Sequence, residues 1–190
     1  MKQKSTFTTK KTVLAALLAA LTVVGSALRI TLPLEIAGTT SFHLGNIMCA
    51  LSGILLGPWL GGLAAGLGSA IYDMMNPLYI SECWITFLTK GAYGIAAGLV
   101  AWSGQKKFSY GKSTVAALAG ALTYAALYLA KSYFYSGILM HGLTPEAALI
   151  TTATKLPATA FNAAVAVIFA PVLAAAIHEA LAKSHMTLDG

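Results

Sequence analysis

Six apolar stretches, separated by short polar turns, make up most of this 190-residue chain. An α-helix needs about 20 apolar residues to cross a bilayer, and a stretch such as VLAALLAALTVVGSAL (13–28) carries no charge at all. Charged residues are only 9% of the chain, whereas a soluble domain carries roughly 25%. The sequence therefore predicts an all-α polytopic membrane protein, with residues 1–190 forming a single membrane domain.

The predicted spans lie at about 12–32, 44–57, 59–75, 82–103, 113–137 and 146–178. The second and third are ambiguous, because they read either as one long kinked helix or as two short helices that meet at Gly57-Pro58. Positive residues in short loops favour the cytoplasm, and six spans put the basic clusters on one side of the membrane. These clusters are Lys2, Lys4, Lys10, Lys11, Lys106, Lys107, Lys112 and Lys183. We therefore expect a six-helix bundle with both termini cytoplasmic, namely a basic N-terminus at 1–11 and a tail at 179–190.

The first stretch also has the pattern of a secretory signal peptide, with a basic start, an apolar centre and small residues near Ala27. Because five further apolar stretches follow it, an uncleaved first span is the preferred interpretation. Cys49 and Cys83 lack CxxC or Cys/His spacing, so they predict neither a disulfide nor a metal site. The cytoplasmic lysines account for the whole formal charge of +6, so no nucleic-acid partner is needed to explain it.

Three lysines, Lys90, Lys131 and Lys155, fall at similar depth inside predicted spans. Each buried charge costs on the order of 3 kcal/mol in a membrane, so it usually has a partner and a role. Residues three or four apart share a helix face, which places each lysine in a polar stripe. The stripes are Thr86, Lys90, Tyr93 and Ala97 on the fourth span, Tyr124, Tyr128, Lys131 and Tyr135 on the fifth, and Thr151, Lys155, Thr159 and Asn162 on the sixth.

Three such stripes predict a shared small-molecule cavity, because a pocket needs apolar walls, aromatic faces and a few convergent polar groups. The tyrosine rings would stack on a planar heterocycle, and Asn162 would bind its amide edge. The loop at 32–43 would close the cavity as a lid. Further candidate binding residues are Asn46, where the second span begins, and Asn76, Tyr79 and Glu82, which precede the fourth.

The alternative is a structural network in which Asp73 and Glu82 neutralise the lysines. For Lys90 itself this structural role is the preferred interpretation. The predicted outer half contains four basic and four acidic residues: Arg29, Lys90, Lys131 and Lys155 against Glu35, Asp73, Glu82 and Glu146. This balance favours a neutral or zwitterionic ligand.

Catalytic motifs are missing from the sequence. YGKST (110–114) resembles the end of a phosphate-binding loop, but the first glycine of GxxxxGK[ST] is replaced by Lys106 and no strand precedes it. HExxH and GxSxG are likewise absent. We expect no enzyme activity, cofactor or metal, so the energy to move a solute would come from an ion gradient or from partner subunits.

Three segments of the chain resemble the S components of energy-coupling factor (ECF) vitamin transporters, in particular the riboflavin-type branch. They are HLGNIMCALSGILLGPWLGGLAAGLGSAIYDMMNP (43–77), TFLTKGAYGIAAGLVA (86–101) and TKLPATAFNAAVAVIFAPVL (154–173). The resemblance implies a high-affinity binding subunit in the bacterial plasma membrane, which takes up a water-soluble vitamin or vitamin precursor. Its implied partners are a transmembrane coupling protein and two cytoplasmic ATPases, with an AxxxA motif on the first helix packing on the coupling protein. Ala16 and Ala20, or Ala15 and Ala19, match that motif.

Two other functions fit parts of the pattern. A small gradient-driven secondary transporter, acting as a homodimer, would use Asp73, Glu82 and the buried lysines as a proton relay. A structural or assembly subunit would bind no ligand, and its lysines would be replaceable by methionine.

Overall fold

The computed structural model describes residues 9–33, 39–104 and 108–184. Its elements in chain order are α1 (Thr9–Ala27), β1 (Arg29–Pro33), β2 (Thr39–His43), α2 (Gly45–Leu56), α3 (Pro58–Met74), the 3-10 turn η1 (Ile80–Glu82), α4 (Cys83–Ala101), α5 (Tyr110–Ala130), the π-helix η2 (Lys131–Met140), α6 (Pro145–Thr154) and α7 (Leu156–Lys183). Because η2 continues α5 and α7 follows α6 after one residue, the helices form six rods. The prediction of an all-α helical bundle is confirmed.

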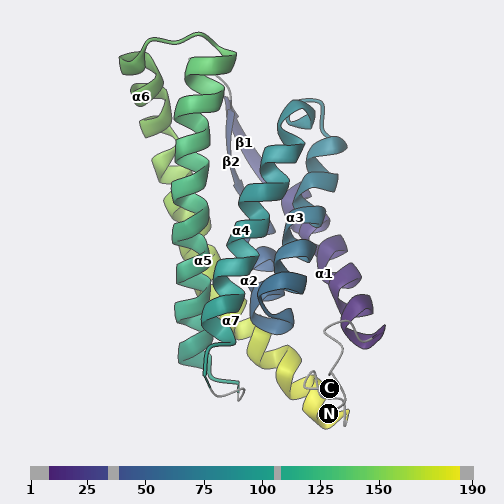
Figure 1. Ribbon diagram of the computed structural model, residues 1–190. Helices are drawn as coiled ribbons and strands as arrows, with labels where there is room; N and C mark the ends of the chain where they lie inside the picture. Colours follow the sequence, from purple (N-terminus) through teal and green to yellow (C-terminus); the bar gives the residue numbers. More distant parts are fainter. Residues whose placement is uncertain (1–8, 34–38, 105–107, 185–190) are drawn as a thin grey trace, which may run out of the picture.

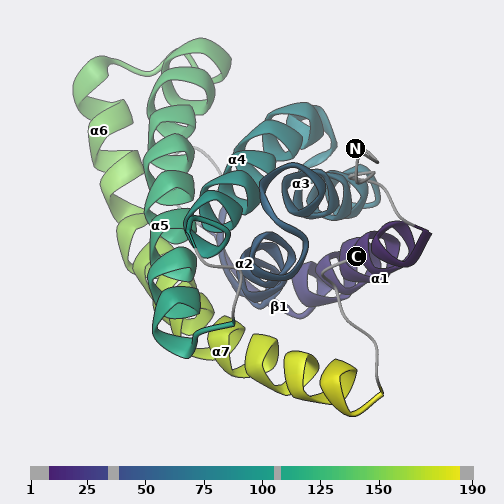
Figure 2. The same ribbon diagram turned by 60° about the horizontal axis from the view of Figure 1, so that its bottom comes forward.

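Helix α2 lies at the centre of the bundle (Figure 2), packed against α1, α3, α4, α5 and α7. Every residue of α2 except Met48 is buried. With 12 residues it is about 18 Å long, whereas four helical segments of the described chain are long and apolar enough to cross a membrane: Thr9–Ala27, Ile80–Ala101, Tyr110–Met140 and Pro145–Lys183. A short central helix surrounded by longer ones leaves room in the bundle beyond its end.

The turn between α2 and α3 decides between one kinked helix and two short ones. Gly57 has a φ of 80°, a conformation that L side chains rarely adopt, and Pro58 begins α3 without needing a backbone N–H donor. The Trp102 ring lies 3.2 Å from the position of a Cβ at Gly57, and its indole N–H donates to the Ile54 carbonyl at 3.0 Å. The chain therefore forms two helices here, locked by a tryptophan from the end of α4.

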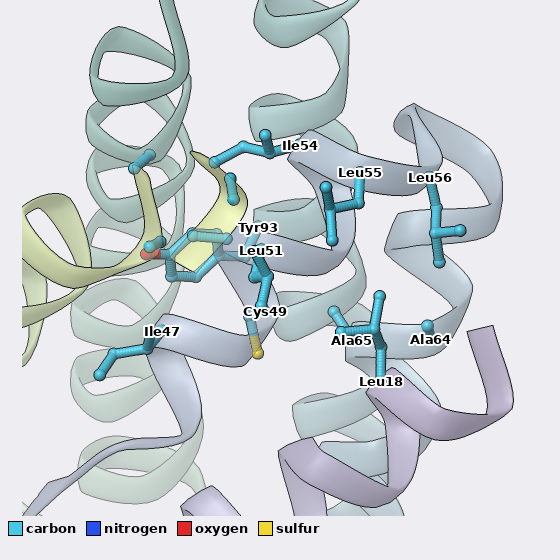
Figure 3. Close-up of a cluster of buried hydrophobic side chains, with 14 of the residues drawn as sticks. Leu18, Ile47, Cys49, Leu51, Ile54, Leu55, Leu56, Ala64, Ala65 and Tyr93 are labelled. Carbon is cyan, nitrogen blue, oxygen red and sulfur yellow. The ribbon is translucent and has the colours of Figure 1, made fainter. Parts of the chain in front are cut away.

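The distribution of polarity is that of a protein surrounded by lipid. Large apolar side chains face outward on every rod except the central helix α2; Trp59, Met75 and Leu139 are about 70% exposed. Polar and charged side chains lie inside, among them Asn46, Asp73, Lys90, Lys155 and Asn162, each less than 10% exposed. The bundle also has an apolar core, shown in Figure 3, to which Leu18 of α1, Leu51 of α2 and Tyr93 of α4 belong.

Four elements differ from the sequence prediction. Helix α1 ends at Ala27 rather than near residue 32, because Arg29 starts a strand. The segment expected to be a lid loop forms an antiparallel hairpin, in which Arg29 pairs with His43 and Thr31 with Ser41. From Lys131 the fifth rod becomes a π-helix. The sixth rod breaks at Lys155, because Pro157 has no N–H to continue the ladder of α6.

The two ends of the bundle differ. Figure 1 shows the hairpin in the upper half, away from the lower end where α1 begins and α7 finishes. At that lower end Lys11 lies 5.6 Å from the centre of the Trp102 ring, and Phe108 stacks on His178 at 4.9 Å. The start of α1, the end of α4, the start of α5 and the end of α7 with Lys183 therefore share one end of the molecule.

Candidate ligand-binding site

A cavity of about 350 Å³ lies under the hairpin, enclosed by α3, α4, α5, η2 and the junction of α6 with α7. This volume is within the range of small-molecule sites. Nine predicted binding residues line it: Tyr79, Glu82, Thr86, Lys90, Tyr128, Lys131, Lys155, Thr159 and Asn162. The structure thus brings together residues from three helices and the η1 turn that are up to 83 positions apart in the sequence.

Four predicted residues, Asn46, Asn76, Tyr93 and Tyr135, do not line the cavity. Asn46 accepts a hydrogen bond from the Lys90 ammonium behind the wall. Asn76 turns the chain after α3, where its amide donates to the Tyr72 hydroxyl at 3.0 Å and accepts from the Leu78 N–H. Tyr93 is fully buried in the core. These residues support the wall of the cavity and do not reach its interior.

The cavity has further lining residues that were not among the candidate binding residues, although one of them, Tyr124, belongs to the polar stripe predicted on the fifth span. They are Ser26, Arg29, Thr40, Ser41, His43, Ser69, Asp73, Leu78, Ser81, Ile85, Thr89, Tyr124, Ser136, Met140 and His141. Arg29 shows why: its guanidinium lies between the rings of Tyr72 and Tyr79, 4.2 and 4.8 Å from their centres, and it donates to the Ser26 carbonyl at 2.7 Å. Only the turn into the hairpin puts Arg29 there, and no local sequence signal marks that turn.

A ladder of three tyrosines runs from the core to the cavity wall. Tyr93 stacks on Tyr124 with a centroid distance of 5.9 Å, and Tyr124 stacks on Tyr128 at 5.6 Å, both with nearly parallel rings. Tyr124 and Tyr128 are four residues apart, so one face of α5 carries both. The Lys90 ammonium lies 3.7 Å from the centre of the Tyr124 ring, which attracts a cation through its π-electrons. The Lys90 ammonium is thus held by the Asn46 side-chain amide and the Tyr124 ring, and it makes no ion pair with any described residue.

The π-helix changes which side chains of the fifth rod reach the cavity. Lys131 forms an ion pair with Glu82, and the Ser136 hydroxyl donates to the other oxygen of the same carboxylate at 2.9 Å. Positions five apart point about 140° apart on an α-helix, but a π-helix bonds residue i to i+5 and so aligns them. Ser136 therefore takes the place predicted for Tyr135, whose ring packs edge-on against Trp84 instead. The prediction of Tyr135 in the wall rested on a 3.6-residue period that this segment does not have.

Asn162 fastens the hairpin to α7. Its carbonyl oxygen accepts from the His43 N–H at 3.0 Å and its amide donates to the Ser41 carbonyl at 2.8 Å. Burial, together with Lys90 and Arg29 nearby, lowers the pKa of His43 well below its usual value of 6.5, so the ring is neutral at pH 7 and accepts from the Gly45 N–H at 3.2 Å. Asn162 thus holds the cover of the cavity in place through the backbone of β2.

Replacing Asn162 by alanine should release the hairpin. Two hydrogen bonds, each contributing about 1 kcal/mol, disappear, so backbone amides of residues 29–33 and 39–43 should exchange with deuterium at least tenfold faster, measured by mass spectrometry. Amides of α2 should be unaffected. Asn76→Ala is the control, since its side-chain bonds lie outside the hairpin. Unchanged exchange in the Asn162→Ala hairpin would contradict this role.

The exposed face of α1 distinguishes between the two AxxxA pairs. Ala15 is buried, and Ala19 packs against the core so closely that its carbonyl would block a Cβ at Gly68 of α3. Ala16 and Ala20 are exposed on the opposite side. Large side chains on the same outward side are Val13, Leu17 and Val24. Of the two pairs, Ala16 and Ala20 remain available for contact with another protein.

An apolar helical bundle with a polar cavity of this size defines a class: multi-pass membrane proteins that bind a small solute within the bundle. The profile of the family described as ECF-type riboflavin transporter, S component, matches residues 6–179, and the chain belongs to this family. It is therefore a membrane-embedded substrate-binding subunit for vitamin uptake with an ECF ATPase module, in a family of transport components rather than enzymes.

Two other proteins are similar in sequence to part of this chain. An uncharacterised protein from Pyrococcus woesei is 30% identical over 118 residues, which is 62% of this chain and 74% of that protein. A UPF0397 protein from Streptococcus gordonii is 33% identical over 96 residues, covering 50% of this chain and 49% of that protein. The chain therefore spans about half the length of this second relative.

Proposed function

We propose that the cavity binds one molecule of a water-soluble vitamin or vitamin precursor, with a planar ring of the ligand stacked on Tyr128. The observation that carries this proposal is the tyrosine ladder, which ends at a cavity of ligand size. Stacked aromatic rings are a favourable surface for a heterocycle, and the surrounding hydroxyls and charges would orient its polar edge. Riboflavin, which the family description names, is the first compound to test.

The binding residues are those whose side chains line the cavity. Tyr79, Thr86, Tyr128, Lys155 and Thr159 would contact the ligand directly. Glu82 and Lys131 neutralise each other and would act chiefly by shaping the wall, and Asn162 would act through the hairpin.

The orientation of the chain follows from its lysines. The end of the bundle that carries Lys10, Lys11, Lys112 and Lys183 would face the cytoplasm, in keeping with the positive-inside rule. The hairpin and the cavity would then face outward, where a nutrient arrives.

The energy for uptake would come from partners. We propose a transmembrane coupling protein that packs on Ala16 and Ala20, and two cytoplasmic ATPases bound to it. The small residues on α1 would let a partner helix approach closely in lipid.

Tyr128→Ala should weaken ligand binding at least tenfold without unfolding the protein, because it removes the ring that would stack on the ligand. The measurement is titration of the solitary purified protein with riboflavin and other water-soluble vitamins, followed by tryptophan fluorescence. Tyr133→Ala is the matched control, since Tyr133 packs edge-on against Phe134 outside the cavity. Equal affinity in the Tyr128 and Tyr133 variants would contradict the stacking site.

A further inference from the structure

Lys155 differs from the other cations of the cavity. It sits at the break between α6 and α7, lines the cavity, and is only 6% exposed. Within residues 9–33, 39–104 and 108–184 it has no hydrogen-bond acceptor for its ammonium and no ion-pair partner. Pro157 interrupts the helix at this point, and the Lys155 side chain points into the cavity from the break.

The other cations of the wall already have partners, and so does Glu82. Arg29 lies between two tyrosine rings and donates to a carbonyl, and Lys90 donates to Asn46 over the face of Tyr124. Lys131 and Glu82 form an ion pair. No described acid within reach of Lys155 is left free, because the nearest one, Glu82, is shared by Lys131 and Ser136.

Among the described residues, basic side chains outnumber acidic ones in the lining of the cavity. Four basic side chains line it, together with only two acids, Asp73 and Glu82. Of the other two acids of the outer half, Glu146 is exposed on the first turn of α6 and does not contribute, and Glu35 lies outside the described residues. The described lining of the cavity therefore does not share the neutral balance counted over the whole outer half of the sequence.

We propose that the ligand carries an acidic group, a carboxylate or a phosphate, and that this group binds the ammonium of Lys155 while the ring of the ligand stacks on the tyrosines. A buried cation without a partner is unfavourable in a membrane interior, and an anionic ligand would supply the missing charge. Charge-assisted hydrogen bonds are roughly twice as strong as neutral ones. This inference rests on the proposed function and narrows its class of ligand.

The test compares compounds that differ only in the acidic group. The solitary protein is titrated with riboflavin 5′-phosphate against riboflavin, nicotinate against nicotinamide, pantothenate against pantothenol, and pyridoxal 5′-phosphate against pyridoxal. In at least one pair the acidic member should bind about tenfold tighter or more. Lys155→Met should remove that preference, Lys155→Arg should keep most of it, and Lys112→Met, at the other end of the bundle, should leave it unchanged.

The outcomes separate this inference from the proposed function. If neutral members bind as tightly as acidic ones in every pair that binds, or if Lys155→Met keeps the preference, the inference is overturned while the binding role stands. If Glu35→Gln abolishes the preference as Lys155→Met does, the partner of Lys155 belongs to the protein, and the inference is again overturned. If no compound binds and none co-purifies, the inference and the proposed function fail together.

Discussion

Gly98→Ala should destabilise the protein by about 2–3 kcal/mol or more, the upper range for overpacking a tight interior. A Cβ at Gly98 would lie 2.5 Å from the carbonyl carbon of Gly57 and from the Cα of Pro58. These are backbone atoms in the turn that joins α2 to α3, so no side-chain rotation relieves the clash. The helices would have to separate, and the turn that supports the central helix would move with them. Thermal unfolding in detergent, followed by circular dichroism, measures the loss.

Gly91→Ala is the matched control, because it makes the same change two turns earlier on the same helix. Here the nearest atom to a new Cβ is the Gly62 carbonyl oxygen at 3.6 Å, an ordinary contact. Alanine is favoured over glycine in a helix by roughly 1 kcal/mol, so this variant should be as stable as the wild type or more so. Similar melting temperatures for the two variants would show that α4 does not pack on the turn as described.

Changing Ala16 and Ala20 together to leucine should abolish uptake and leave ligand binding intact. Both residues are exposed on α1, on the side away from the core and from the cavity. Leucine would add bulk where a partner helix is proposed to approach, while the bundle itself has nothing to repack. The readouts are uptake of labelled ligand by cells that express the partner subunits, and titration of the purified variant.

Ala126→Leu with Ala130→Leu provides the control for this pair. These residues are also four apart and exposed, but lie on α5, on a helix for which no partner is proposed. Uptake should persist in the α5 variant. Loss of uptake in both double variants would indicate a general effect of added bulk, and loss of binding in the α1 variant would mean that α1 is not separate from the site.

The helices were predictable because lipid imposes a simple rule of length and polarity on them. The Gly57-Pro58 pair marked the turn between α2 and α3, and the charge pattern favoured two helices there. The hairpin was not predictable: RITLP and TTSFH (29–33 and 39–43) are short, and Pro33 and Gly38 fit a loop as well as a turn between strands. Two hydrogen bonds from Asn162 on α7 hold β2 in place. The long-range contact, rather than local propensity, defines that element.

The site was predictable wherever helices keep a regular period. Thr86 with Lys90, and Lys155 with Thr159, reach the cavity because four residues make nearly one helical turn. Tyr135 does not line the cavity because the π-helix shifts the phase of the fifth rod. Tyr93 does not line it because its polar stripe continues into the buried core. Neither the cavity's depth nor a π-helical segment has a clear signature in the sequence of one chain.

The occupancy of the cavity is the most direct test of the proposal that this protein binds a water-soluble vitamin or vitamin precursor. The protein, purified alone from the membranes of cells grown in rich medium, is denatured, and the released small molecules are identified and counted by mass spectrometry. We expect one water-soluble, ring-containing compound in a ratio approaching one per chain, and a strong reduction of that ratio in Tyr128→Ala. Protein that carries no such compound, and that no water-soluble vitamin or precursor stabilises when added, would contradict the proposal.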